Sequence, residues 1–326
     1  MVLFSDINNL IICIGVLMTY QKFIYSFASS ILEAFFDIET KSVNVQIIMI
    51  LSCFLFIQIP LTLIRKMQYL QYVSIIGSIM LLYSIIIIVI KSYMQYKIAR
   101  IKYEIIEFEK FGWNHINAMS IFLFGFCCHN GVLQVLIELN RPSKNRFVNI
   151  QNRSFVLQIL LYFAISFFGY FSFLGGTKDN ILSNYPNNDM YIFVSKILLF
   201  FCLHCSLAIN YNIMRLSFKS LWLKPGEKNF SFLKDLFFSF LTLFICNIFV
   251  YYVKSITNIL GIVGGFSTVV ICFLNPIMIY VLSNGYSRYS LYNLFAYFIL
   301  MFTGTVGILS TSYNLYYFII SQSKDK

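Results

Sequence analysis

"FGFCCHNGVLQVLIELNRPSKNRF", residues 124–147, places small and polar residues inside a strongly apolar run. Two glycines, two cysteines, a histidine and an asparagine stand among the apolar side chains, and Glu138 and several cations follow. Glycine weakens a helix, and a polar group in an apolar setting needs a hydrogen-bond partner. The stretch therefore predicts either a broken helix or a polar contact between helices.

The composition of the whole chain sets its class. The 326 residues are 59% apolar and only 11% charged, and the mean hydropathy is +0.76. Soluble domains have roughly 45–50% apolar and 25% charged residues. The sequence therefore predicts an all-α polytopic membrane protein.

Long uncharged runs place the expected helices, because crossing the hydrocarbon takes about 20 apolar residues in helical form. About nine spans are expected, at 5–32, 42–64, 69–92, 112–139, 154–176, 190–214, 232–253, 255–283 and 289–320. A polytopic enzyme is disfavoured, because the chain has no HExxH, carboxylate cluster or Ser/His/Asp set.

The loops alternate in charge, which predicts the orientation because cytosolic loops retain Lys and Arg. One alternate set is rich in cations: Arg65, Lys66, Arg141, Lys144, Arg146, Arg153, Arg215, Lys219, Lys224 and Lys228. The other set mixes acids with bases. The N-terminus is thus expected in the cytosol. Topology accounts for most of the net charge of +11, and no nucleic-acid partner is expected.

All eight cysteines fall within expected spans and are interpreted as reduced packing residues. Cys127, Cys128 and His129 could form a metal site with Cys202, His204 and Cys205. The two groups lie on different expected helices, however, and neither CxxC spacing nor a carboxylate supports the pairing. No metal site is predicted.

A second unusual run, "ITNILGIVGGFSTVVICFLNP" at 256–276, holds three glycines, a serine and two threonines in a span that reaches Pro276. It indicates close packing or a broken helix. Close packing is favoured, because glycine with serine and threonine is the usual pattern at contacts between membrane helices.

Four stretches in order carry a resemblance to a known family. They are "IGVLMTY" (14–20), "PLTLIRKMQYLQYVS" (60–74), the 124–147 stretch with its CysHis, ValLeu and GluLeu pairs, and "ILGIVGGFS" (259–267) with Pro276. Together they resemble the third, fourth-to-fifth, sixth and tenth helices of the amino acid/auxin permease family, particularly its sodium-coupled neutral amino acid transporters.

The resemblance implies a leucine-transporter-like inverted-repeat fold, with this chain supplying the third to eleventh helices. Residues 1–322 would form one transmembrane domain, with an incomplete first repeat at 1–95, a second repeat at 112–284 and an extra helix at 289–320. The family's first two helices are then missing. An N-terminally incomplete transporter is the favoured interpretation, and a short chain with lost or altered transport is the alternative.

The resemblance also implies the site residues. Substrate would contact Gly125, Cys128, His129, Asn130, Gly131 and Thr19, and a coupling ion would contact Cys205 and Ser206. Apart from the resemblance, Glu138 lies at the expected cytosolic end of its span and is interpreted as an inner-gate or loop-anchoring partner for a cation such as Arg141, Lys144 or Arg215, with snorkelling at the interface as the alternative. Relatives carry Pro and Glu where this chain has Asn130 and Gly131, and a hydroxyl where it has Cys205. These differences leave the coupling ion open between sodium and protons. Proton coupling through His129 is a candidate, but a neutral interhelical hydrogen bond is the favoured interpretation of this residue.

The expected function is secondary active amino acid transport by alternating access, driven by a sodium or proton gradient. No cofactor is expected besides the coupling ion. A non-conducting amino-acid sensor or an inactive truncated permease is the alternative. The expected location is the plasma membrane or the membrane of an acidic or vacuolar organelle.

Overall fold

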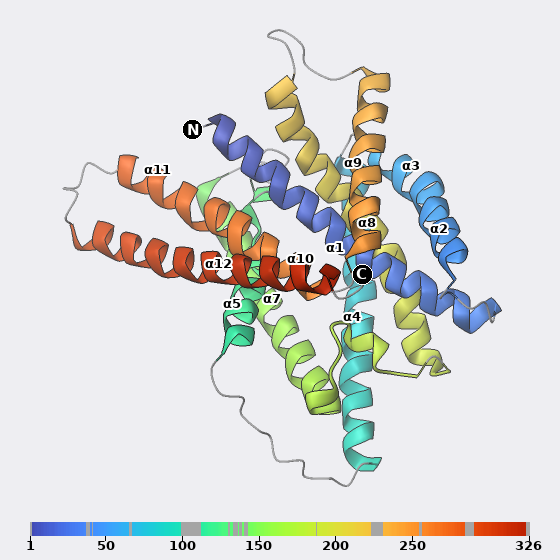
Figure 1. Ribbon diagram of the computed structural model, residues 1–326. Helices are drawn as coiled ribbons and strands as arrows, with labels where there is room; N and C mark the ends of the chain where they lie inside the picture. The colour runs from blue at the N-terminus through green and yellow to red at the C-terminus, as the bar shows by residue number, and fades with distance from the viewer. Residues whose placement is uncertain are drawn as a thin grey trace. The chain divides into compact units, whose positions relative to one another are not determined.

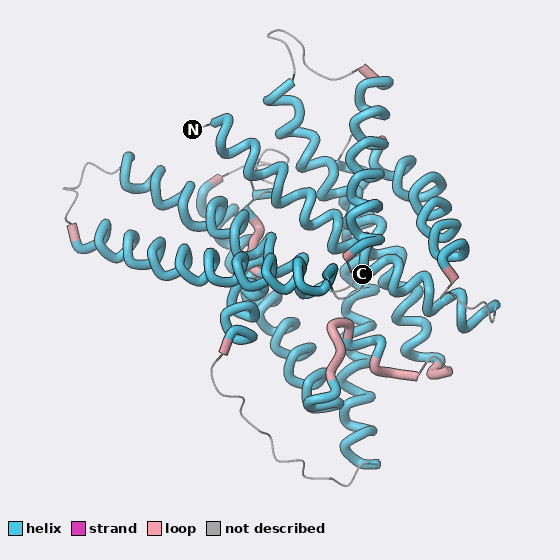
Figure 2. The backbone as a smooth tube through the Cα atoms, in the orientation of Figure 1, coloured by secondary structure: helices cyan, strands magenta, loops and turns pink. Residues whose placement is uncertain are grey.

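The structure is a computed structural model that describes residues 2–36, 40, 42–64, 67–98, 112–129, 131–132, 136, 139, 143–186, 188–222, 231–253, 256–283 and 290–323. Every regular element in these ranges is a helix (Figures 1 and 2). The chain divides into two compact units. Unit 1 comprises Met1–Thr19, Glu109–Leu133 and Asn210–Lys326, and unit 2 comprises Tyr20–Phe108 and Gln134–Ile209.

Within the described ranges, eight segments are long and apolar enough to cross a membrane. They are α1 (Val2–Phe36), the run α2 (Val43–Ser52), η1 (Cys53–Gln58) and α3 (Ile59–Thr62), α4 (Met67–Ile98), α7 (Lys144–Phe173), α8 (Met190–Trp222), α9 (Phe232–Tyr252), the run α10 (Ile256–Val263), η4 (Gly264–Thr268), η5 (Val270–Leu274) and α11 (Asn275–Ser283), and α12 (Leu291–Ser323). The prediction of a polytopic all-α protein is confirmed.

The remaining expected span, 112–139, differs from the others. Its described helix, α5 (Trp113–Gly125), ends after 13 residues, which is shorter than the roughly 20 needed to cross the hydrocarbon. Several residues after position 129 lie outside the described ranges. The structure therefore shows an interrupted helix where the uncharged run by itself suggested a span.

Two prolines widen the helices before them. Proline has no N–H to donate, and its ring clashes with the carbonyl four residues earlier. Before Pro60, the N–H of Ile59 bonds the carbonyl of Phe54 in the π-helical turn η1. Before Pro276, the N–H of Asn275 bonds the carbonyl of Val270 in η5. Both segments stay helical by shifting to a five-residue spacing.

In unit 1, α10 and η4 pack against both α5 and α12, which also contact each other, and α10–α11 runs alongside α12 (Figure 1). The glycines of the 256–276 run permit this approach. A Cβ on Gly264 would lie 2.5 Å from the carbonyl oxygen of Ser120, and one on Gly265 would lie 2.7 Å from that of Gly307. Real Cβ atoms essentially never approach so closely. The close-packing interpretation of this run is confirmed.

Side-chain hydrogen bonds join two of these helices, α5 and α12. The Nδ2 of Asn314, on α12, donates to the Oδ1 of Asn117, on α5, at 2.8 Å. The hydroxyls of Ser120 and Ser310 lie 2.6 Å apart. Small residues that admit close approach, with polar side chains that bond across the contact, are typical of helix pairs in membranes.

Unit 2 has an apolar core at one end of its helices. Its buried members come from α1, α4, α8 and the connection before α8: Phe27, Ile87, Ile88, Leu182, Tyr185 and Ile192. Polar contacts hold that connection in place. Asp189 pairs with Lys91 and accepts a hydrogen bond from the N–H of Tyr191 in the first turn of α8. A carboxylate there also faces the positive end of the helix dipole.

Candidate functional site

The backbone leaves the helix within the stretch that suggested a break. After Gly125, the residue Phe126 has a turn conformation (φ −97°, ψ 4°), and Cys127 and Cys128 are not helical. The N–H of Cys127 bonds the carbonyl of Phe124 at 3.0 Å. Of the two alternatives that the sequence left open, the structure shows the broken helix at the described residues 126–128.

The residues after the break resume a helical turn. The N–H of Gly131 bonds the carbonyl of Cys128 at 3.2 Å, and His129 is helical. Cys128 and His129 are both exposed, whereas Gly131 is half-buried. A Cβ on Gly131 would lie 3.2 Å from the terminal methyl of Ile213. Two of the predicted substrate residues thus present their side chains at the surface of the break.

Thr19 has a different setting. It is buried, and its hydroxyl donates to the carbonyl of Gly15 at 2.9 Å within α1. This is the usual bond of a threonine to the preceding helical turn. The hydroxyl would have to exchange that bond in order to hold a substrate, so its predicted role stays a prediction.

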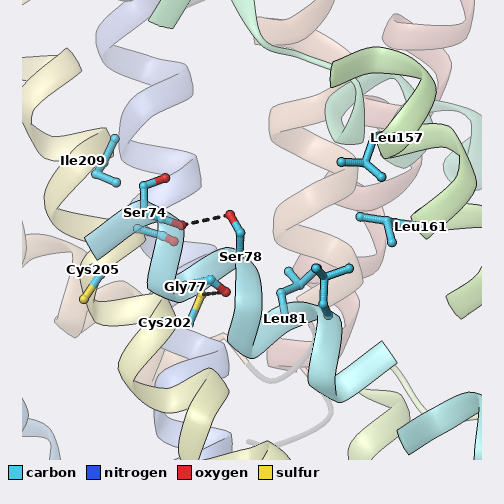
Figure 3. Close-up of a pocket in the computed structure, with 11 residues that line it drawn as sticks. Ser74, Gly77, Ser78, Leu81, Leu157, Leu161, Cys202, Cys205 and Ile209 are labelled. Atoms are coloured by element: carbon cyan, nitrogen blue, oxygen red, sulfur yellow. Dashed lines mark hydrogen bonds between the residues drawn. The ribbon is translucent and has the colours of Figure 1, made fainter. Parts of the chain in front are cut away.

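Cys205 and Ser206, the predicted ion ligands, line a cavity of about 250 Å³ in unit 2 (Figure 3). Small residues of α4, namely Ser74, Gly77 and Ser78, form one part of the lining, and leucines of α4 and α7 form another. The thiol of Cys202 donates to the carbonyl of Gly77 at 3.5 Å. The sequence did not single out the α4 residues.

The side chains that line this cavity are uncharged in their usual protonation states. Its lining contains hydroxyls, thiols and aliphatic side chains and includes no carboxylate among the described residues. The hydroxyl of Ser78 already donates to the carbonyl of Ser74 at 2.9 Å. Sodium is a hard cation that favours oxygen ligands, whereas the thiol of Cys205 is a soft ligand. The available oxygens would come from hydroxyls and backbone carbonyls.

Arg215, the predicted gate residue, belongs to a buried charged group in unit 1. Its Nε lies 3.0 Å from the Oδ1 of Asp235, and both side chains are at most 4% exposed. Its guanidinium also donates to Asn212 and lies 5.1 Å from the ring centre of Tyr211. Asp235 was not predicted from the sequence as a partner of Arg215. A lone carboxylate in the first turn of an apolar span was the signal, since such residues are costly in membranes and usually paired.

Two of the predicted site residues lie outside the described ranges, namely Asn130 and Glu138. The pairing of Glu138 with a cation therefore stays a prediction. Arg215 has a carboxylate partner in Asp235.

Comparison of the sequence with known proteins identifies its family. The sequence profile described as "Transmembrane amino acid transporter protein" matches residues 1–320. The chain belongs to the transmembrane amino acid transporter family. The resemblance carried by the four sequence stretches is confirmed at this level. The family consists of membrane transporters and is not an enzyme family.

A relative from Plasmodium falciparum (isolate 3D7) carries the name "Putative amino acid transporter AAT1". It is 24% identical over an alignment of 345 positions. The alignment covers 90% of this transporter-family chain and 56% of the relative. The chain thus spans little more than half the length of the relative it matches.

Proposed function

We propose that this chain carries out secondary active transport of amino acids by alternating access, within a leucine-transporter-like arrangement of helices. The observation that supports it is the interruption after α5 in a member of a transporter family. Transporters of this kind hold substrate with the backbone groups that a discontinuous helix leaves available.

The chemistry at the break suits a zwitterion. An amino acid presents an ammonium and a carboxylate, which need acceptors and donors respectively. The non-helical Cys127 and Cys128 leave carbonyls and amides of the adjoining turns outside the regular helical ladder. Residues 112–132 contain no Asp, Glu, Lys or Arg. We therefore propose neutral amino acids as the first substrate class and cationic amino acids as the second.

A transport assay tests this function directly. The full-length protein is reconstituted in liposomes, and uptake of labelled neutral and cationic amino acids is followed under an inward sodium gradient, an inward proton gradient and no gradient. Gradient-dependent accumulation is expected. If the protein binds amino acids and yet moves none under any gradient, the transport proposal fails and a sensor is favoured.

The coupling ion is proposed to bind beside Cys205 and Ser206. Because a thiol is a poor sodium ligand, the cavity lining favours weak sodium dependence in the natural chain. Cys205→Ser supplies an oxygen at the same position and should increase the stimulation of uptake by sodium. Cys246→Ser is the control, because Cys246 is a buried thiol of unit 1 that does not line this cavity. An unchanged sodium response in Cys205→Ser would contradict this placement.

We further propose that Arg215 and Asp235 form a gate towards the end of α8 that is expected to face the cytosol from the Lys and Arg residues of the alternate loops. Removing one charge of a buried pair costs about 3–5 kcal/mol, whereas an apolar pair of similar size can be neutral or stabilising. Asp235→Asn should therefore destabilise the protein, and the double variant Arg215→Met with Asp235→Leu should fold. A gate predicts altered uptake in the folded double variant. Uptake at the natural rate there would show that the pair is only structural.

A further inference from the structure

Three side chains of unit 1 with metal-binding atoms meet at the break. They are Cys127 in the non-helical turn, His129 just after it, and Cys272 in η5. The Sγ atoms of Cys127 and Cys272 lie 3.1 Å apart. A ring nitrogen of His129 lies within 4.8 Å of both sulfurs.

The backbone on both sides explains why these atoms meet. The loss of helix after Gly125 allows Cys127 and His129, two residues apart, to present their side chains together, although they would face different sides of a regular helix. On the other side, the π-helical turn before Pro276 admits an extra residue and rotates the side chains around Cys272. Each irregular segment contributes at least one ligand.

We propose that Cys127, Cys272 and His129 form a zinc-binding site that bridges the break after α5 to η5. Two thiolates and one imidazole form a ligand set that suits zinc. Because zinc takes four ligands in a tetrahedron, the fourth position remains for water or an outside ligand. Binding displaces the two thiol protons to solvent and uses the neutral imidazole.

Charge favours Zn²⁺ over Cu⁺ at this set of ligands. Two thiolates balance the two charges of Zn²⁺, so that the complex is neutral, whereas the same ligands around Cu⁺ carry a net negative charge. Burial of a net charge in an apolar setting is costly. Residues 112–132 contain no Asp, Glu, Lys or Arg that could balance a net charge, so the neutral Zn²⁺ complex is favoured there.

The distances are close to those that zinc requires. With Zn–S bonds of about 2.3 Å and tetrahedral angles, two sulfur ligands lie about 3.8 Å apart. The two sulfurs, at 3.1 Å, need to separate by less than an ångström. Cys127 and His129 lie in and beside a non-helical turn, where side chains can make such an adjustment without moving a long helix.

A spectroscopic titration tests the site without any transport assay. The full-length protein, purified in detergent under reducing conditions, is titrated with Co²⁺, which substitutes for Zn²⁺ and reports thiolate ligands through a charge-transfer band. One Co²⁺ per chain and its displacement by Zn²⁺ are expected. Each of Cys127→Ser, Cys272→Ser and His129→Ala should weaken Zn²⁺ binding by more than about 100-fold, because a direct ligand matters more than an outer-shell partner.

Cys128→Ser is the matched control, because it removes the neighbouring exposed thiol and leaves the three ligands in place. It should bind Zn²⁺ as the natural chain does. Loss of binding in Cys128→Ser, or retention of binding in Cys272→Ser, would overturn the assignment.

A second measurement uses only the natural sequence, in case a variant fails to fold. Zn²⁺ should protect Cys127 and Cys272 from alkylation in isolated membranes and leave Cys128 reactive, as read from labelled peptides. Equal labelling of Cys127 with and without Zn²⁺ would overturn the proposal. Recovery of Cys127 and Cys272 as a disulfide from rapidly thiol-blocked membranes would also overturn it, because no thiolates would then remain for zinc.

Discussion

Two segments of unit 1 interrupt their apolar runs with glycine and polar residues, and they use those residues in different ways. The segment 124–132 leaves the helix at Phe126 and exposes Cys128 and His129. The run 256–276 stays helical through two π turns, and two of its glycines, Gly264 and Gly265, admit the backbones of other helices. Segments of similar composition thus form a break in the helix at 126–128 and a close contact between helices at 256–276.

The difference lies in what each glycine faces. A Cβ on Gly265 would meet a backbone carbonyl, which belongs to a helix and cannot move alone. A Cβ on Gly131 would meet the terminal methyl of Ile213, which can rotate away. A substitution in the packed run should therefore reduce stability, whereas one at the break should mainly alter function.

Among substitutions in these two segments and their direct contacts, the largest effect is expected for Gly265→Val. Its side chain would meet the carbonyl of Gly307 and the methyl of Thr311 and force α12 away. Overpacking of this kind lowers the free energy of unfolding by about 1–3 kcal/mol, and a branched side chain should reach the upper end. Unfolding in mixed micelles measures the loss.

Gly304→Ala is the control for that substitution, because Gly304 lies on the same helix α12 and its Cβ would meet nothing within 4 Å. It should be neutral or slightly stabilising. Equal losses in both variants would break the contrast between packed and open glycines.

An intermediate effect is expected for Asn314→Ala. Asn314 is fully buried and bonds Asn117 and the carbonyl of Ser310. Its removal deprives the buried partners of a donor, which costs about 1–3 kcal/mol. The same unfolding assay measures it. A change below a few tenths of a kcal/mol would show that these bonds contribute little to the packing of α5 on α12.

At the break, Gly131→Ala is expected to change activity more than stability. Alanine has a higher helix propensity than glycine by about 1 kcal/mol. This difference would shift the equilibrium constant between a broken and a continuous helix roughly fivefold toward the continuous form. Uptake should fall severalfold, while the unfolding free energy stays the same or rises slightly. A clear loss of stability with normal uptake would assign this glycine to packing instead.

The smallest effect is expected for Ser120→Ala. This substitution removes one hydroxyl from the pair with Ser310, which still lies 3.3 Å from the Oδ1 of Asn117. Because the partner keeps another bond, we expect a loss of about 0.5 kcal/mol. Unfolding measurements beside Asn314→Ala would rank the two contributions, and a larger loss for Ser120→Ala would reverse the expected order.

Much of the fold could be predicted because membrane helices follow from composition over about 20 residues. Polar and small residues after Gly125 made a break one of two alternatives, and the sequence could not separate it from a polar contact between continuous helices. Asp235 was missed as the partner of Arg215, because two residues 20 positions apart on different helices have no local signal that joins them. The cavity beside Cys205 likewise depends on Ser74 and Gly77 from α4.

The sequence by itself determined a polytopic membrane protein of the amino acid transporter family, because apolar run length and four ordered motifs are properties of the chain alone. Only the tertiary structure decided that Cys272 lies beside Cys127 and His129. From the sequence alone, the candidate partners of Cys127 and His129 were Cys202 and Cys205. The π turn before Pro276 rotates the side chains around Cys272, and this rotation cannot be predicted from regular helical periodicity. Periodicity describes regular helices, and a contact made at irregular turns depends on geometry that periodicity does not contain.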